Sequence, residues 1–192
     1  TVLHQGFFES GWDGWTDGGS DSFRYAGSRS PEGTYSIRLR DNTSSSTMTL
    51  GNFDVTSYSS IEVAFSFYAR SMETNEDFWV QFYNGSSWQT VATYARGVDF
   101  NNNTFYTATV NIDSTSYNFP SNAEFRFRCD ASGNNDQIYI DQVTITGNSG
   151  AAFAPNSITA LGNGIQGIAG DNDNDDFDFD DDFDDFDDEF DD

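Results

Sequence analysis

The sequence predicts an all-β protein, an antiparallel β-sandwich of the jelly-roll type, followed by a non-globular acidic tail. Runs of alternating apolar and polar residues recur at intervals of roughly 10–15 residues, and their two-residue period is typical of half-buried strands. Aromatic residues make up 17% of the chain and favour strands. No window shows the period of an amphipathic helix. Many short strands separated by turns are typical of a sandwich.

The expected strands follow one another in chain order, each bounded by turn residues. Residues 61–69 show the cleanest alternation and are expected to form a central strand. The Pro-Glu-Gly sequence at 31–33 is a turn that leads into a strand, and the Asn-Gly pair at 84–85 is a hairpin signal. Nine or ten strands are expected in all, the clearest being 2–9, 35–39, 47–50, 61–69, 78–83, 88–94, 106–112, 125–129 and 138–145.

The last two expected strands flank a turn rich in Asp and Asn, with the sequence DASGNND. In the final strand the apolar residues are even-numbered up to Ile140 and odd-numbered from Val143 onward. Either a β-bulge lies between them, or the odd-numbered face points inward throughout and carries Tyr139 and Asp141 with it. In the second case a carboxylate is buried, which requires hydrogen-bond donors, a cation or a metal ion.

The charge of the chain is concentrated in its last residues. Residues 171–192 carry 15 acidic and no basic residues, while residues 1–170 carry 17 acidic residues and eight Arg, or −9 of the formal charge of −24. This excess argues against nucleic acid as a partner, and the absence of a long apolar run predicts no transmembrane segment. The single cysteine, Cys129, lies in an alternating run, which favours a buried and inert thiol.

Composition divides the chain into three parts. Residues 1–147 hold the expected strands and form the jelly-roll domain. Residues 148–170 are small, uncharged and mildly apolar, and are expected to be a linker or a segment that docks on its own sandwich or on a neighbouring subunit. In residues 171–192 Phe recurs among acids that repel one another. Cation binding, binding to a basic and partly apolar partner, and a purely solvating role are the alternatives for this tail.

Several motifs occur in a distinctive order. FESGWDGW is followed by EGTYSIRLR, by the long alternating strand, by FWVQFYNGSSWQTV and finally by FRFRCDASGNNDQIYIDQVTI. Over about residues 5–147 this order resembles the MAM family of jelly-roll modules and related bacterial extracellular modules. The chain lacks the disulfide cysteines of animal MAM domains, so the resemblance is to the microbial, cysteine-poor branch. It implies an extracellular adhesion or carbohydrate-binding role without catalysis, often with a structural calcium ion between the first strand, an early loop and the last strand.

Five carboxylates are candidates for such a calcium site. Glu9 closes the first strand and Asp141 lies in the last one, and these strands are commonly neighbours in a jelly roll, so the two side chains are expected to meet. Glu32 lies in the turn at 31–33, and Asp130 and Asp136 belong to the Asx-rich turn. Calcium takes six to eight oxygen ligands, which these residues could supply. The alternative for the turn residues is that they cap and tighten a hairpin.

Two strand faces are candidates for sugar binding. Trp79, Gln81 and Tyr83 share one face of a strand, and Arg126 and Arg128 share the polar face of another. Sugar rings stack on flat aromatic groups while their hydroxyls need donors and acceptors, so the two faces would form a binding platform if they belong to one sheet. The alternative is that the aromatic residues pack beneath a loop as a second hydrophobic layer.

Catalytic chemistry has little support in the sequence. The only histidine, His4, lies near the first residues, and no motif singles out a pair of carboxylates for glycoside hydrolysis, so we expect no enzyme. Candidate glycosylation sequons begin at Asn42, Asn84 and Asn102, all in expected loops.

The sequence therefore predicts a secreted, non-catalytic module for adhesion or assembly at an extracellular or cell surface, such as the subunit of a filament or matrix, with a structural calcium site. Its expected partners are other copies of itself or another extracellular protein. The alternative is a carbohydrate-binding module that acts beside a polysaccharide-active enzyme and binds a polysaccharide.

Overall fold

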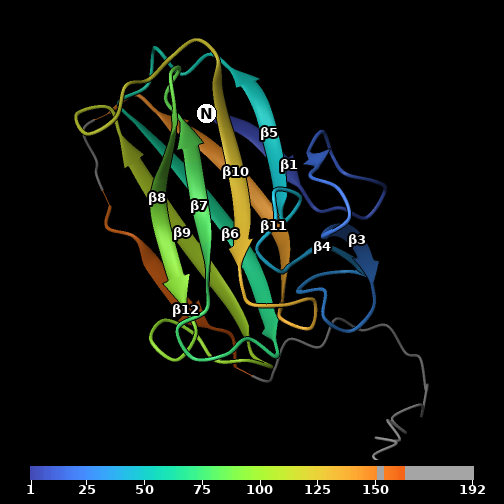
Figure 1. Ribbon diagram of the computed structural model, residues 1–192. Helices are drawn as coiled ribbons and strands as arrows, with labels where there is room; N and C mark the ends of the chain where they lie inside the picture. Colours follow the sequence, from blue (N-terminus) through green and yellow to red (C-terminus); the bar gives the residue numbers. More distant parts are fainter. Residues whose placement is uncertain (151–153, 163–192) are drawn as a thin grey trace, which may run out of the picture.

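The computed structural model describes residues 1–150 and 154–162, which form two antiparallel sheets packed face to face (Figure 1). This arrangement confirms the predicted all-β sandwich. The expectations for residues 171–192 lie outside the described residues.

The larger sheet has seven strands and the smaller one has five. The larger sheet contains β1 (Val2–Gly6), β3 (Ser22–Ala26), β4 (Tyr35–Arg40), β6 (Ser60–Arg70), β9 (Phe105–Asp113), β11 (Gln137–Asn148) and β12 (Ser157–Ala160). The smaller sheet contains β2 (Thr16–Asp17), β5 (Thr47–Phe53), β7 (Asp77–Tyr83), β8 (Trp88–Ala95) and β10 (Ala123–Asp130). Their orders are β12-β9-β6-β11-β4-β3, with β1 also paired to β11, and β2-β5-β10-β7-β8.

The core between the sheets is dominated by aromatic side chains. Phe65 and Phe67 of β6 face Phe78 of β7 and Phe127 of β10, and all four are buried. The ring centroids of Phe65 and Phe127 lie 4.8 Å apart and those of Phe67 and Phe78 lie 4.9 Å apart, both edge to face, which is a favourable geometry for aromatic pairs. Cys129 is fully buried in the same cluster, as its alternating run indicates.

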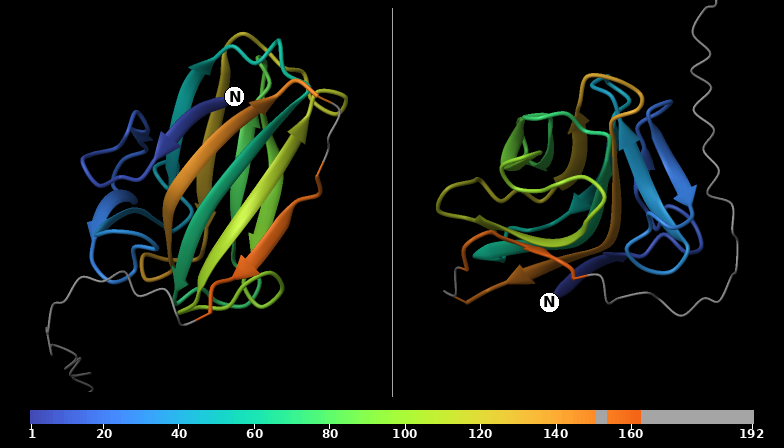
Figure 2. Two further views of the ribbon diagram at one scale, coloured as in Figure 1. Left: turned by 180° about the vertical axis from the view of Figure 1, so that it is seen from behind. Right: turned by 90° about the horizontal axis from the view of Figure 1, so that it is seen from below.

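Each of the nine clearest runs corresponds to a strand, and β6 is central in the larger sheet, as predicted. Three further strands, β2, β3 and β12, were not expected. β3 has the sequence SFRYA and buries no large apolar side chain, so it lacks the alternation that marks the others. β12 lies in residues 148–170 and directs Ile158 to the core while pairing with β9 at the sheet edge (Figure 2). The sandwich therefore continues past Gly147.

β11 contains a β-bulge, the first of the two alternatives for its change of phase. Its register with β6 shifts between Asp141 and Thr144, and Gln142 has a φ of 51°. The apolar residues before and after the bulge are all fully buried, so the extra residue keeps both halves of the strand facing the core. At the same point β11 changes its neighbour on one side from β4 to β1.

Candidate functional site

The bulge in β11 is a place where three backbone segments meet. β4 pairs with β11 before the bulge and β1 pairs with it after, and the residues that follow β1 and precede β4 include Glu9 and Glu32. The backbone N–H of Glu32 donates to Asp141 Oδ2 at 3.0 Å, and that of Gln142 donates to Asp141 Oδ1 at 2.7 Å. The bulge thus leaves the Asp141 carboxyl on the outer side of the sheet, covered by the turn before β4.

Asp141 is fully buried, although the bulge alternative did not require it. Burial raises the pKa of its carboxyl to about 7; the two backbone N–H donors lower the pKa, and the charges of Glu32 and Glu9 raise it. The Glu9 carboxylate is itself held in place, because its Oε1 accepts the backbone N–H groups of Thr34 and Tyr35 at 3.0 and 2.9 Å. Strands β1 and β11 are neighbours, as expected, and Glu9 and Glu32 lie close enough to Asp141 for their charges to raise its pKa.

The predicted calcium ligands do not form one cluster. Across residues 1–150 and 154–162, no group of three or more His, Cys, Asp or Glu side chains is arranged to hold a metal ion. Asp136 lies with Glu73 and Glu76 around Ser132. The single hydroxyl hydrogen of Ser132 can be donated to Glu73 Oε2 at 3.3 Å or to Asp136 Oδ2 at 3.4 Å, and its backbone N–H donates to Glu76 Oε1 at 2.5 Å. Asp130, at the end of β10, lies opposite an aspartate of β7. Asp136 thus belongs to a local hydrogen-bonded group at the turn, whereas Asp130 lies close enough to the aspartate of β7 for its charge to raise the pKa of that residue.

The two candidate sugar-binding faces form one surface, because β7 and β10 are adjacent in the five-stranded sheet. The register places Arg126 opposite Gln81 and Arg128 opposite Trp79, with Tyr83 at the end of the same face. Gln81 is 6% exposed and the other four side chains are half-buried. The condition set by the sequence, that both faces belong to one sheet, is met.

A continuous row of contacts orders the centre of this surface, which we call the platform (Trp79, Gln81, Tyr83, Trp88, Thr90, Arg126 and Arg128). Arg126 Nε donates to Gln81 Oε1 at 2.8 Å, and Gln81 Nε2 donates to Thr90 Oγ1 at 3.0 Å. The guanidinium carbon of Arg126 lies 4.0 Å from the ring centroid of Trp88, whose ring is 5.6 Å from that of Tyr83. These contacts hold a planar cation over a flat ring and an amide beside the cation.

The second arginine of the platform is also held by neighbours. Arg128 Nη2 donates to Asn42 Oδ1 at 3.0 Å, and its guanidinium carbon lies 5.3 Å from the ring centroid of Trp79. Burial lowers the pKa of Arg126, and the nearby charge of Arg128 lowers it further. Neither guanidinium forms an ion pair with a carboxylate of the described residues. Both are therefore available to a ligand on the outer face.

The sequence did not predict Trp88 and Thr90 as sugar-binding residues. The Asn-Gly hairpin places Trp88 directly opposite Tyr83, so this signal could have assigned Trp88 to the same face. Thr90 lies opposite Gln81 only because the register between β7 and β8 shifts between Val80 and Gln81. The sequence pattern does not mark this second bulge.

The three sequon asparagines lie outside strands, and each side chain forms hydrogen bonds with the protein. The Asn102 amide donates to and accepts from the backbone of Met72, at 2.8 and 3.2 Å. Asn84 Oδ1 caps the hairpin by accepting the N–H of Ser86 at 3.1 Å. Asn42 holds an arginine of the platform, so a glycan there would disturb that contact.

No protein-family model matches the sequence, and no curated protein matches it either, so the resemblance to MAM modules has no support from a family model. The described residues contain no helix that is long and apolar enough to cross a membrane.

Solved structures of low sequence identity share the fold. The CBM22-1 xylan-binding domain of Xyn10C from Paenibacillus barcinonensis superposes with a TM-score of 0.58 at 16% identity, covering 79% of this chain and 97% of that one. A family 16 carbohydrate-binding module-2 gives 0.52 at 18% identity, covering 76% and 99%. The K2 cleaved adhesin domain of Lys-gingipain gives 0.52 at 14% identity, covering 74% and 98%.

The described fold is therefore a β-sandwich of the class that includes carbohydrate-binding modules and adhesin domains. Carbohydrate-binding modules predominate among the similar structures, and these domains are binding modules rather than catalytic ones.

Proposed function

We propose that this chain is a secreted, non-catalytic carbohydrate-binding module that binds a polysaccharide on the platform of its five-stranded sheet. The contact row from Trp88 through Arg126 and Gln81 to Thr90 carries this proposal. The predominance of carbohydrate-binding modules among similar structures supports it over adhesion or assembly, the first interpretation of the sequence.

The chemistry of the platform suits a sugar. Arg126 lies over one face of the half-buried Trp88 ring and Arg128 lies over the Trp79 ring, so a pyranose ring would stack on the parts of these rings that the guanidinium groups leave open. The terminal nitrogens of Arg126 can donate to hydroxyls, because within the described chain its guanidinium forms a hydrogen bond through Nε alone. Since Gln81 and Trp88 already fix this guanidinium, binding orders little that is not ordered beforehand, which favours affinity.

Binding assays on variants of the platform test the proposal. The protein is run through gels that contain soluble xylan or another plant or microbial polysaccharide, after a glycan array has identified ligands. We expect Trp88→Ala and Trp79→Ala each to weaken binding by roughly ten-fold, or about 1.4 kcal/mol. Phe23→Ala, which removes an exposed ring from the opposite sheet, is the matched control and keeps full affinity. Undiminished binding in both tryptophan variants, or no glycan bound at all, would rule out the platform as a sugar site.

Adhesion or assembly is the second candidate function, and one feature of the fold favours it. β8 is an edge strand of eight residues without a charged residue or proline, and in the described part of the chain it pairs only with β7. Such edges readily pair with a strand of another chain. Light scattering of the native protein measures this directly: a polymer or dimer supports assembly, and a monomer at all concentrations contradicts it.

Structural calcium is a further proposal that the arrangement around Asp141 supports only in part. A buried carboxyl with two other carboxylates nearby is a suitable starting point for a calcium site, but the side chains of Glu9 and Glu32 do not converge on it as they stand. Calcium binding therefore requires these two side chains to turn toward Asp141. A calcium titration followed by calorimetry, with Asp141→Asn as the control, tests the proposal.

A further inference from the structure

The seven-stranded sheet carries a second group of flat side chains on its outer face, away from the platform. We call it the outer row. It crosses five adjacent strands, and each member lies directly opposite the next in register. From β9 to β3 its members are Phe105, Tyr68, Tyr139, Arg38 and Phe23.

The members of the outer row contact one another across the strands. The ring centroids of Tyr68 and Phe105 lie 4.9 Å apart and those of Tyr68 and Tyr139 lie 6.1 Å apart. The guanidinium carbon of Arg38 lies 5.1 Å from the ring centroid of Phe23. Phe23 is 53% exposed, which is unusual for a phenylalanine in an ordered strand. Tyr139, in the middle of the row, is 1% exposed, because Tyr25 and Arg29 lie against its ring. The parts open to a partner are therefore the half-buried Phe105 and Tyr68 on one side of it and Arg38 and Phe23 on the other.

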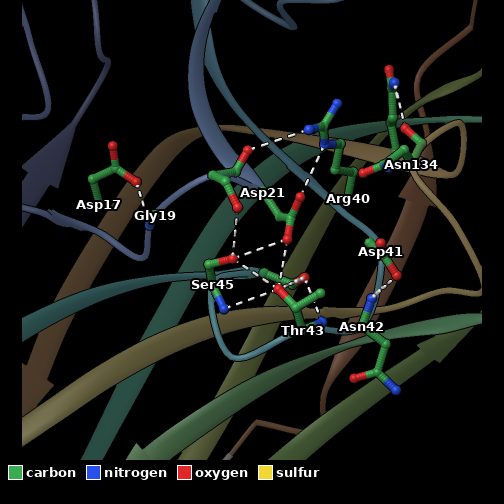
Figure 3. Close-up of polar contacts among 12 residues, drawn as sticks. Asp17, Gly19, Asp21, Arg40, Asp41, Asn42, Thr43, Ser45 and Asn134 are labelled. Atoms are coloured by element: carbon green, nitrogen blue, oxygen red, sulfur yellow. Dashed lines mark hydrogen bonds and ion pairs between the residues drawn. The ribbon is translucent and has the colours of Figure 1, made fainter.

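This face also carries arginines without carboxylate partners among the described residues. Arg38 and Arg70 project to the outer face from β4 and β6, and Arg29 lies over the ring of Tyr139 at 5.7 Å. Within the described residues the one ion pair joins Arg40 to Asp21 at 3.2 Å, and the Asp21 carboxylate also accepts two hydroxyl groups (Figure 3). Arg38 Nε is buried and finds no hydrogen-bond acceptor in this part of the chain. These guanidinium groups can bind carboxylates of a partner, while Glu62 on the same side of β6 and the net charge of −9 for residues 1–170 oppose an acidic partner elsewhere on the domain.

The chain itself contains a segment of matching chemistry. Residues 171–192 carry 15 acidic residues, no basic residue and five phenylalanines. Guanidinium groups bind carboxylates in a paired, planar geometry, and phenylalanine rings pack edge to face on aromatic rings. Charge and apolar character are thus complementary between this segment and the outer row.

The described chain leaves the sheet beside the outer row. The backbone N–H of Leu161 donates to the carbonyl oxygen of Phe105, the first member of the row, at 2.8 Å. Residues 162–170 can span at most about 30 Å, at roughly 3.3–3.6 Å per residue. The row crosses four gaps between strands of about 4.8 Å, or roughly 19 Å in all. Residue 171 can therefore reach any member of the row.

We infer that residues 171–192 bind the outer row of the same chain. Their carboxylates bind the guanidinium groups of Arg29, Arg38 and Arg70, and their phenylalanines pack on the exposed part of the row. The short connection keeps the segment at a high effective concentration, which strengthens contacts that would be weak between separate molecules. This contact is independent of the proposed sugar site, because the platform lies on the other sheet.

Paramagnetic relaxation in the full chain tests this inference. A nitroxide label is attached to a cysteine introduced by Asn174→Cys; the buried Cys129 is protected from the label. The expected result is strong broadening of the backbone amide signals of Phe23, Tyr68 and Phe105. The amides of Trp79 and Trp88 on the opposite sheet keep their line widths. Selective broadening of the platform instead, or no selective broadening, would overturn the inference.

Variants and salt separate the two parts of the contact. Arg38→Gln combined with Arg70→Gln is expected to reduce the broadening at least two-fold, whereas the matched pair Arg126→Gln and Arg128→Gln leaves it unchanged. Replacing the five phenylalanines of residues 171–192 by serine reduces it without altering any described strand. Salt at 1 M, where the screening length is about 3 Å, also reduces it. Binding between copies is tested by mixing the nitroxide-labelled chain with an isotope-labelled chain that carries no nitroxide. If broadening appears only in this mixture, the segment binds another copy and the intrachain inference is overturned.

Discussion

Replacing the buried carboxyl at the bulge should change the pH dependence of stability. The Asp141 carboxyl has a pKa of about 7 in the folded protein, against an ordinary value of 3.8 that applies to the unfolded chain. Between these values the folded protein holds a proton that the unfolded chain has released. The free energy of unfolding therefore falls as the pH rises from about 4 to about 7, and it is constant with respect to this group above that range.

The magnitude follows from the size of this interval. Each pH unit within it changes the free energy of unfolding by about 1.36 kcal/mol, so the native protein should lose about 3 kcal/mol between pH 5 and pH 8 through this group. Asp141→Asn has no titrating group at this position and lacks the loss. The variant loses one hydrogen bond, because Glu32 and Gln142 donate to different oxygens of Asp141 and the amide NH2 group replaces one of these acceptors, which costs about 1 kcal/mol. The two stability curves should therefore cross.

Urea denaturation followed by tryptophan fluorescence at pH 5, 6, 7 and 8, with chelator present, measures the difference between the two proteins. Subtracting the curves removes groups that titrate alike in both, such as Asp21, whose pKa is lowered chiefly by its hydrogen bond from Thr43. Parallel curves over this range would refute the account of Asp141. Added calcium should raise the stability of the native protein most at pH 8 and leave the variant unchanged, because the ion binds the ionised carboxylate. An equal response of both proteins would exclude calcium at Asp141.

Three further outcomes follow from buried groups. Burial raises the pKa of the Cys129 thiol, so a thiol reagent at pH 8 should react only after the protein unfolds, and rapid reaction of the native protein would contradict its inertness. Phe127→Ala removes a ring that is 1% exposed, and denaturation should show a loss of about 3–5 kcal/mol; a loss below 1 kcal/mol would mean that the core does not depend on this ring. The Tyr94 hydroxyl is buried without a partner among the described residues, and burial raises its pKa to about 12, so Tyr94→Phe should stabilise the fold by about 1 kcal/mol. Destabilisation by that variant would reveal a partner for the hydroxyl.

The alternation of apolar and polar side chains predicts most strands because each of these strands buries one of its faces, and this burial is visible in its own sequence. It fails for β3 and β12 for the same reason. β3 carries Phe23 and Tyr25 on its outer face and buries only small or polar groups, and β12 contributes Ile158 alone to the core. Both segments are strands because a neighbouring strand offers unpaired backbone N–H and C=O groups. The sequence of either segment alone does not show that such a neighbour is present.

The candidate site was only partly predictable. The platform could be assembled from two strand faces, but whether those faces adjoin depends on the order of β5, β10 and β7, whose residues are far apart in the chain. Burial of Asp141 could be suspected from the change of phase. It arises, however, through the turn that covers the outer side of the bulge, and the sequence predicted burial only for the other alternative.

By itself the sequence determined the class of the fold, the positions of most strands, the buried thiol and the concentration of acidic residues in 171–192. These properties depend on local period and composition. Only the tertiary structure decided which strands are neighbours, that Trp88 and Thr90 join the platform, and that five strands align the outer row beside the point where the described chain leaves the sheet. Those features depend on pairings between residues tens of positions apart, and the free energy of such pairings is not encoded in any one segment.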